Sequence, residues 1–442
     1  YVVTQGTTYY SDDIRAAITG NNNIGENTLK VSDATGFQPG DKVLLAIMQD
    51  DVANGYANVG KYEYNLVLSV QSNELKLLNP LTNAYTNAGA VRCQVIKVPV
   101  FNNLTVDGTL SCHAWDGQTG GILSMLVNQN LNISAGGQIT ASGKGFRGGA
   151  SIPSWGGGYQ GEGVFGPGVR NYVANAGGGG GGNAEWCHSG QGGGGGGYLL
   201  SGTTAPSPCY SCGGGWAFGS CGNSGFGGNA QTIDASRIIL GSGGGSGGVD
   251  GDNPDWGGYG GNGGGVILIG ASQIAGNGLI ESNGLQGDNS PGETGGGGGG
   301  SGGFIGLSSI PVGVTVNANG GSGGKLGDAR YGGQGANGVT NTNLSSINAT
   351  NNSLVLWSTG ATTPSITVSP TQTTTYYATV SNGVHSCKDS VKVTVQNFSP
   401  NLFAQDTIKI CGTSTTLDAG AGYASYSWSN GANTQTINAT RS

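Results

Sequence analysis

The sequence predicts an all-β protein in three regions. Short runs of alternating apolar and polar residues, typical of strands, occupy both ends of the chain. Residues 131–340 hold 74 of the chain's 92 glycines, and a β-rich pattern recurs between their glycine stretches. A chain of 442 residues is long enough for about three domains. We therefore expect a β-rich head domain at 1–130, a glycine-rich domain at 131–340 and a tail of further β modules.

The head reads as a small antiparallel β domain. The stretch NTLKVSD alternates apolar and polar residues, KVLLAIMQ is a short buried run, and QPGD (Gln38–Asp41) supplies a turn. The segment DDIRAAITG is the one place where a short helical turn is expected.

The middle region contains an internal repeat, with copies at Gly120–Gly149, Gly264–Gly287 and, more loosely, Gly302–Gly324. Each copy has a β run, an Ala/Ser turn, a second short strand and a glycine-rich excursion. Short strands with glycine corners predict a coil-by-coil β-solenoid, or a sheet stacked against the excursions.

Three runs of six glycines, Gly177–Gly182, Gly192–Gly197 and Gly295–Gly300, need a separate explanation. Each glycine costs about 0.5–1 kcal/mol relative to alanine in a regular element. Glycine can form a threefold extended helix, polyglycine II, whose backbone groups bond to neighbouring helices and not within the helix. Equal run lengths favour packed polyglycine II helices. The alternative is a flexible linker.

The glycine-rich region resembles the polyglycine domains of phage tail-fibre adhesins and of one receptor-kinase ectodomain. Strings such as GFQPGDKVLLAIMQ and GGNGGGVILIGASQI resemble the N-terminal part of large secreted bacterial surface proteins. This second resemblance covers residues 30–340 and implies location more than activity.

The tail resembles the Ig-like repeats of Bacteroidota surface proteins, through Leu356–Gly383 and Cys411–Ile437. The resemblance implies an Ig-like sandwich module at 341–397 and a partial second module at 398–442, with Trp357 and Trp428 as core anchors. It also implies export by the type IX secretion system and a relationship to gliding-motility adhesins. We expect the chain to be the N-terminal portion of a longer protein, with an already processed N-terminus.

Eight cysteines fit an exported protein, in which disulfides are the expected state: Cys93, Cys112, Cys187, Cys209, Cys212, Cys221, Cys387 and Cys411. Cys93 and Cys112 flank a hairpin-sized stretch and are candidates for a pair. Cys387 pairs with Cys411, or Cys411 has a partner further on. Zinc at the Cys209-x-x-Cys212 cluster, with His188 nearby, is the alternative.

Charge and motifs argue against several functions. Charged residues make up 9% of the chain and the net charge is −7, so no basic surface is available for nucleic acid. No run of about 18 apolar residues predicts a membrane span. The three histidines lie in separate regions, and no hydrolase or nucleotide-binding motif occurs, so we do not expect an enzyme.

Binding is expected in the glycine-rich insertions, where aromatic rings suited to sugars or protein ligands are concentrated. The alternative is that the rings cap the glycine lattice. The candidate ligand-binding residues are Trp155, Tyr159, Trp186, Tyr210, Trp216, Trp256 and Tyr259. We expect the loops carrying Trp155, Cys209–Cys221 and Asp250 to converge on one face.

Two further site types are expected. Asp250, Asp252 and Asp255 form a D-x-D-x-x-D pattern whose carboxylates suit calcium, the one cofactor considered. The pattern lacks the twelfth-position glutamate of an EF-hand, and it favours a solvated acidic turn over a calcium site. Ser390 and Thr407 match a Bacteroidota O-glycosylation pattern of Asp, Ser or Thr, and an apolar residue.

Together these features predict an extracellular cell-surface adhesin, presented on an Ig-like stalk, whose partners are the secretion machinery and a surface, glycan or protein ligand. The alternative function is a structural subunit or cap of an extracellular filament, for which an open sheet edge or a donated strand is the expected sign.

Overall fold

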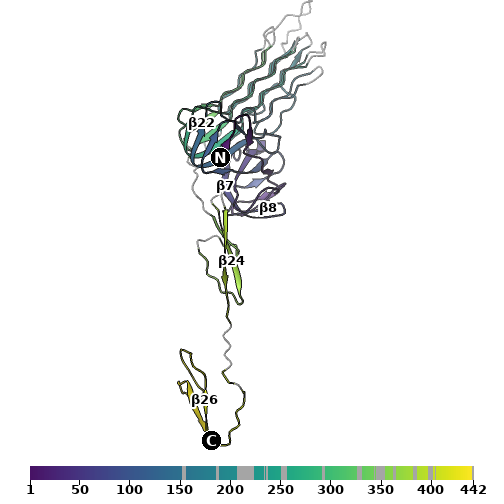
Figure 1. Cartoon of the computed structure of the whole chain (residues 1–442). Coiled ribbons are helices and arrows are strands. Elements are labelled where there is room, and N and C mark those ends of the chain that lie inside the picture. The colour runs from purple at the N-terminus through teal and green to yellow at the C-terminus, as the bar shows by residue number, and fades with distance from the viewer. Residues whose placement is uncertain are drawn as a thin grey trace, which may run out of the picture. The chain divides into compact units, whose positions relative to one another are not determined.

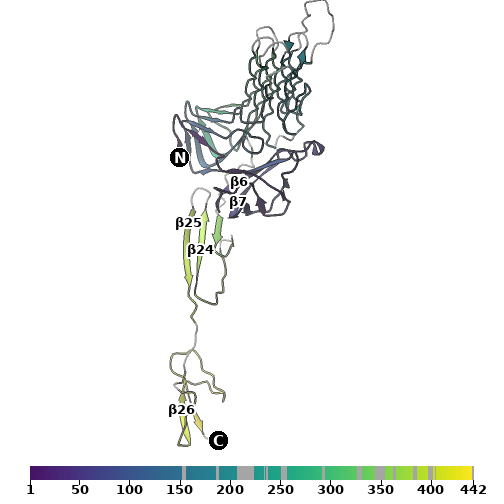
Figure 2. The ribbon, with the colours of Figure 1, turned by 90° about the vertical axis from the view of Figure 1, so that its right-hand side faces the viewer.

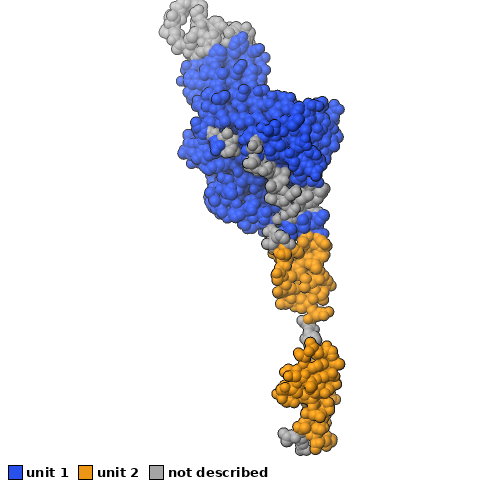
Figure 3. All heavy atoms as spheres, turned by 90° about the vertical axis from the view of Figure 1, so that its left-hand side faces the viewer, with its two compact units in different colours: residues 1–356, 379–388 blue, residues 357–378, 389–442 orange. Residues whose placement is uncertain are grey.

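The computed structural model describes the chain apart from residues 152–155, 186–188, 207–222, 233, 235–236, 250–255, 291–293, 326–330, 343, 345–353, 362–364, 382–385, 397–401, 404 and 441–442. Contacts divide it into two units, residues 1–356 with 379–388, and residues 357–378 with 389–442 (Figure 3). The described part is all-β, as predicted, with one 3₁₀ turn at Val52–Asn54. It contains no helix long and apolar enough to cross a bilayer.

The frame of the first unit is a β-solenoid built from two parallel sheets. Sheet A has the strand order β1 (Val2–Val3), β12 (Leu104–Val106), β14 (Ile122–Ile133), β18 (Val266–Gly276), β20 (Phe304–Leu307) and β22 (Val339–Asn341), with β11 (Val100–Phe101) also paired to β14. Sheet B has the order β2 (Thr8–Tyr10), β13 (Thr109–Ser111), β15 (Gln138–Thr140), β19 (Leu279–Glu281) and β21 (Thr315–Asn317). Five coils each place one strand in sheet A and one in sheet B, and β22 extends sheet A.

The internal repeat predicted from sequence corresponds to these coils, since its copies contain β14–β15, β18–β19 and β20–β21. In-register pairing stacks Leu110, Ile139 and Ile280 on the inward side of sheet B. They are fully buried against the inward residues of sheet A, including Leu123 and Ile267. The stacked coils therefore form a continuous apolar core.

The antiparallel β domain is an insertion between the first and second coils. Its six strands have the order β3 (Arg15–Ala17), β10 (Arg92–Lys97), β6 (Lys42–Gln49), β7 (Tyr62–Gln71), β8 (Glu74–Leu77) and β5 (Thr28–Lys30), and β4 (Asn21–Asn22) pairs with β9 (Tyr85–Thr86). The expected domain boundary near residue 130 falls inside β14, and β1 and β2 belong to the solenoid.

Strand β6 shows why the run KVLLAIMQ is apolar throughout. Val43 and Leu45 face the core of the inserted domain, whereas Leu44 and Ala46 face a second core shared with sheet A and the base of the glycine-rich region. The short helical turn expected at DDIRAAITG is wrong. Ala16 and Ile18 alternate into the core of the inserted domain, so Arg15–Ala17 forms β3.

The glycine-rich excursions run side by side as extended segments, which we call the array (Figures 1 and 2). Backbone bonds join them with a period of three residues. In segment 241–249, every third N–H donates to the same neighbour: Gly241 to Gly264, Gly244 to Gly261 and Gly247 to Gly258, at 2.7–2.9 Å. Residues between these donate to two other segments. The Gly243 and Ser246 N–H groups donate to the carbonyls of Glu162 and Tyr159, and those of Gly245 and Gly248 donate to the carbonyls of Gly194 and Gln191. Bonding to the same neighbour at every third residue has the period of a threefold extended helix.

Two of the six-glycine runs, Gly192–Gly197 and Gly295–Gly300, lie where the array is most enclosed. Three segments are bonded to six neighbours each: 241–249, 191–197 and 295–302. For 241–249 the neighbours are 145–149, 156–162, 177–182, 191–197, 256–264 and 295–302. An enclosed segment has other backbones on every side, so most of its positions are glycine, and exceptions such as Ser242, Ser246 and Ser301 carry small, fully buried side chains. The bonding between glycine runs predicted from sequence is present.

Segments on the perimeter follow a different rule, a side chain at every third position. The repeats are Trp256-Gly-Gly-Tyr259-Gly-Gly-Asn262, Asn319-Gly-Gly-Ser322-Gly-Gly-Lys325 and Tyr331-Gly-Gly-Gln334-Gly-Ala-Asn337. A threefold helix directs every third residue the same way. All these side chains except the partly buried Asn262 are exposed, and most of the residues between them are buried.

The tail contains a three-stranded sheet, β23 (Leu354–Trp357), β24 (Thr374–Ser381) and β25 (Ser386–Val393), and a hairpin of β26 (Ser414–Asp418) and β27 (Thr436–Thr440). Trp357 and Trp428 are both half-buried, and the Trp428 indole Nε1 donates to the Thr434 carbonyl at 2.7 Å. The Ig-like character of these modules stays a prediction.

The small hairpin β16 (Ala184–Glu185) and β17 (Ser189–Gly190) belongs to the array region.

An interior glycine should not tolerate a methyl group. A Cβ on Gly194 would overlap the Phe226 carbonyl oxygen, whereas on Gly157 its nearest neighbour would be the Asn183 side chain at 3.3 Å. We expect Gly194→Ala to lower the free energy of unfolding by about 3 kcal/mol, and Gly157→Ala by less than about 1 kcal/mol. Chemical denaturation measures both, and equal losses would contradict the enclosed lattice.

The perimeter side chains should also keep arrays from pairing. Replacing all three of Tyr331, Gln334 and Asn337 by glycine leaves this perimeter segment without side chains, as in the interior. The backbones of two copies of the protein can then approach within hydrogen-bonding distance. We expect this triple glycine variant to self-associate in analytical ultracentrifugation. The triple alanine variant is the control, because a methyl group still blocks the approach, and it should sediment like the wild type. Identical sedimentation of all three proteins would refute the idea.

Candidate binding surfaces

Many of the residues expected to bind ligands lie outside the described residues. These are Trp155, Trp186, Tyr210 and Trp216, the acidic residues Asp250, Asp252 and Asp255, and the cysteines Cys187, Cys209, Cys212 and Cys221. The expected convergence of three loops, the calcium site and the cysteine cluster therefore stay predictions. Among the residues that are described, no group of three or more His, Cys, Asp or Glu side chains is placed to hold a metal.

Trp256 and Tyr259 are placed on the array perimeter, in segment 256–264. Their side chains are 50% and 47% exposed. Because they are three residues apart on a threefold helix, they lie on one side of the segment, about 9 Å apart. Two backbone contacts hold them: the Thr294 hydroxyl donates to the Trp256 carbonyl at 3.2 Å, and the Asp288 N–H donates to the Tyr259 carbonyl at 2.8 Å.

The neighbouring segment adds apolar and acidic side chains to this surface. The Leu285 N–H donates to the Asn262 carbonyl, so Leu285 and Asp288 follow the same three-residue spacing alongside Asn262 and Tyr259. Leu285 and Asp288 are both exposed. We call Trp256, Tyr259, Leu285 and Asp288 the aromatic row. Three apolar or aromatic groups beside a carboxylate suit a ligand with a flat apolar face and polar edges.

Tyr159 lies on a different perimeter segment, 156–162. Segment 145–149 lies between it and segment 256–264 and forms backbone hydrogen bonds with both. The Arg170 guanidinium carbon is 5.4 Å from the centroid of the Tyr159 ring. Further round the perimeter, Tyr172 and Phe226 pack edge to face with centroids 5.7 Å apart. Tyr198 does not reach the surface, because its ring is buried and its hydroxyl donates to the Ile239 carbonyl. Exposed rings thus occur on several sides of the array.

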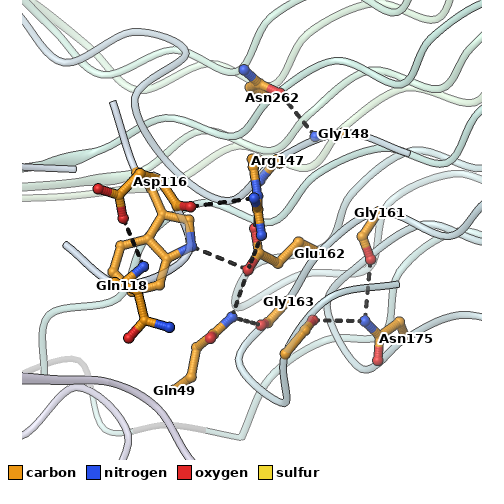
Figure 4. Close-up of polar contacts among 12 residues, drawn as sticks. Gln49, Asp116, Gln118, Arg147, Gly148, Gly161, Glu162, Gly163, Asn175 and Asn262 are labelled. Atoms are coloured by element: carbon orange, nitrogen blue, oxygen red, sulfur yellow. Dashed lines mark hydrogen bonds and ion pairs between the residues drawn. The ribbon is translucent and has the colours of Figure 1, made fainter. Parts of the chain in front are cut away.

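A buried carboxylate joins the three parts of the first unit. Glu162, 3% exposed, belongs to the array and accepts from the Gln49 amide of the inserted domain at 3.0 Å and from the Trp115 indole of a solenoid loop at 3.1 Å. The Arg147 Nε donates to its other oxygen at 2.8 Å (Figure 4). These contacts with Glu162 raise the pKa of the Arg147 guanidinium. We call this cluster the Glu162 joint, and its full complement of donors marks it as structural.

The predicted pairing of Cys93 with Cys112 is wrong. Both are free, buried thiols among the described residues, Cys93 in the core of the inserted domain and Cys112 in the solenoid core. Their side chains face different cores, so the short sequence separation does not bring them together. Burial raises the pKa of Cys93 to about 12 and also raises that of Cys112, which keeps both protonated. In the described tail, Cys387 and Cys411 are likewise unpaired, both exposed.

The two residues expected to carry O-linked sugars are accessible. Ser390, on β25, and Thr407 are both exposed. The Ser390 N–H donates to the Asp389 carboxylate at 2.7 Å. Their modification stays a prediction.

Comparison with known proteins gives few relatives. No family model matches the chain, and no curated protein matches it. Among solved structures, the Gp54 tailspike of Acinetobacter baumannii bacteriophage AP22, in complex with A. baumannii capsular saccharide, is 16% identical, with a TM-score of 0.18 over 32% of this chain and 31% of that one.

Two Pseudomonas phage tailspikes match similarly. The gp49 tailspike of phage LKA1 has 14% identity and a TM-score of 0.18 over 31% of this chain and 26% of that one. The gp61 tailspike of phage phi297 has 14% identity and a TM-score of 0.18 over 32% and 28%. The chain spans less than a third of the length of each. Likenesses this partial carry no argument about activity, which has to come from the residues themselves.

Breaking the Glu162 joint should destabilise the first unit. In Glu162→Gln an amide faces the Arg147 and Trp115 donors and the compensating charge is lost, so we expect a loss of about 3 kcal/mol in the free energy of unfolding. Glu74→Gln, an exposed position on β8, is the matched control and should change stability by less than about 0.5 kcal/mol. Thermal and chemical denaturation compare the two, and a Glu162 variant as stable as the control would show that the joint is dispensable.

Proposed function

We propose that this chain is part of a secreted cell-surface adhesin, in which the glycine array holds exposed aromatic rings against a glycan or protein ligand. The observation that carries the proposal is the aromatic row: Trp256 and Tyr259 are each about half exposed on a segment bonded along its length to its neighbours. Large exposed rings on a fixed framework are an unusual use of apolar surface unless they contact something.

The array makes these rings effective contacts. Aromatic side chains with few rotatable bonds contribute most of the energy at many interfaces. A loop that must be ordered on binding loses conformational entropy, which lowers affinity. Here the backbone under the rings is already bonded on several sides, at Gly258 and Gly260, and the Ser151 hydroxyl donates to the Gly257 carbonyl. Asp288 beside Tyr259 supplies an acceptor for hydroxyl or amide groups at the edge of the ligand.

Location and export follow from composition and resemblance, and form part of the same proposal. The chain has 9% charged residues and a Thr- and Ser-rich tail that resembles Bacteroidota surface repeats. We infer that the type IX machinery exports it, that the tail modules form an Ig-like stalk, and that Ser390 and Thr407 carry sugars there. Binding without catalysis is the proposed activity.

The test removes the rings and measures attachment. We expect Trp256→Ala combined with Tyr259→Ala to weaken attachment of the purified protein to its best target on a glycan array, or to host or abiotic surfaces, by tenfold or more, because a tenfold change needs only about 1.4 kcal/mol. Tyr172→Ala, an exposed ring on another side of the array, is the control. Undiminished attachment with an intact fold would reject the aromatic row, and concentration-dependent fibres would favour the filament function.

A further inference from the structure

We propose that the outer face of sheet B is a second, chemically different binding surface, which takes a linear neutral polysaccharide lying across the strands. All-parallel sheets ordinarily have both faces covered. The outer face of sheet A obeys this rule, since Ile122, Leu126 and Val266 are buried in the core shared with the inserted domain. Most outward residues of sheet B are polar and are exposed or partly buried, although Ser111 is buried.

Strand register sets these residues in straight rows. The pairings of sheet B align Tyr10, Ser111, Thr140, Glu281 and Asn317 across its five strands. Neighbouring strands are about 4.8 Å apart, so the row is about 19 Å long. That spacing is comparable with the length of one hexose unit, so successive sugars of a linear chain meet successive strands.

The row is pre-ordered by hydrogen bonds between side chains. The Thr140 hydroxyl donates to Glu281 Oε1 at 3.2 Å, and the Asn283 amide donates to Oε2 at 2.9 Å. In the neighbouring outward row, two residues earlier on each strand, the Gln138 amide donates to the Thr109 hydroxyl at 3.0 Å. Side chains that already hold one conformation lose little entropy when a ligand binds.

One end of the row carries an aromatic platform. The Tyr10 ring, 37% exposed, lies 4.5 Å from the His113 ring at an angle of 31°. His113 is fixed by Asp12, a buried carboxylate whose Oδ1 accepts from the His113 backbone N–H at 2.9 Å and lies 3.0 Å from its Nδ1. The second Asp12 oxygen, Oδ2, has no hydrogen-bond partner, although the Arg15 Nε is 3.9 Å away. A ring held in this way offers a flat surface for the face of a sugar.

Charge selects the class of polysaccharide. The aligned row contains one carboxylate, Glu281, and no lysine or arginine, and Asp13 Oδ1 lies 3.7 Å from His113 Nε2 beside the platform. A polyanionic chain would meet these carboxylates, and the row itself offers no lysine or arginine to pair with it. Hydroxyl groups, which both donate and accept, match the mixture of hydroxyl, amide and carboxylate groups in the row. The chemistry therefore favours a neutral polysaccharide over an acidic one.

The test is affinity electrophoresis of the full chain in gels containing hydroxyethyl cellulose, laminarin or mannan as neutral polysaccharides, and alginate as the polyanion. We expect retardation by at least one neutral polysaccharide and none by alginate. Tyr10→Ala and Glu281→Gln should each weaken that retardation tenfold or more, while Tyr10→Phe keeps the ring and should retain it. Melting temperatures establish that each variant is folded.

The aromatic-row variant Trp256→Ala/Tyr259→Ala separates this proposal from the proposed function, because it should leave neutral-polysaccharide retardation unchanged. Retardation lost in that variant and kept in Tyr10→Ala and Glu281→Gln would overturn the sheet B site and support the aromatic row. Failure of all three neutral polysaccharides to retard the wild type would also overturn it, as would binding of alginate through sheet B.

Discussion

The first unit depends on backbone hydrogen bonds that cross from one extended glycine segment to the next. A threefold extended helix has no internal partner for its N–H and C=O groups, so each segment is stable only when others surround it. The separation that lets the bonds form also excludes side chains: a Cβ on Gly179 would overlap the Gly194 carbonyl oxygen, and a Cβ on Gly245 that of Gly180. Each bond contributes about 1 kcal/mol, comparable with the entropic cost of a glycine.

The solenoid positions the segments so that these bonds can form. Excursions leave after a strand of sheet B and return before a strand of sheet A, as between β15 and β18 and between β19 and β20. Because the coils are parallel and stacked, successive excursions begin in register. Apolar residues at the base, such as Phe146 and Tyr198, pack with Leu268 of sheet A and Met48 of the inserted domain. The Glu162 joint adds a polar connection among the same three parts.

Much of this could be predicted from sequence, and the remainder has physical reasons. The repeat predicted the coils because Ile, Leu and Val recur at fixed positions in each copy. The sequence did not distinguish the inserted domain from the solenoid. The reason is that β1 and β2 supply only a few residues to the first coil, and their pairing partners lie about a hundred residues further along the chain. The pairing of Cys93 and Cys112 was wrong because spacing carries no information about which core a side chain faces. Glu162 gave no signal, since its partners come from distant segments. The x-Gly-Gly repeats are visible in the sequence. On a threefold helix their non-glycine residues all lie on one side, which identifies these segments as the perimeter of the array.

The three-residue spacing on the perimeter separates what holds the array together from what it shows to the outside. Two positions in three are committed to the framework, and the third can be exchanged for almost any side chain without touching a backbone bond. A protein built this way can acquire a new surface by single substitutions at sites such as Trp256, Ser322 or Gln334. The array therefore acts as a scaffold on which surface side chains can change one at a time while the backbone hydrogen bonds stay the same.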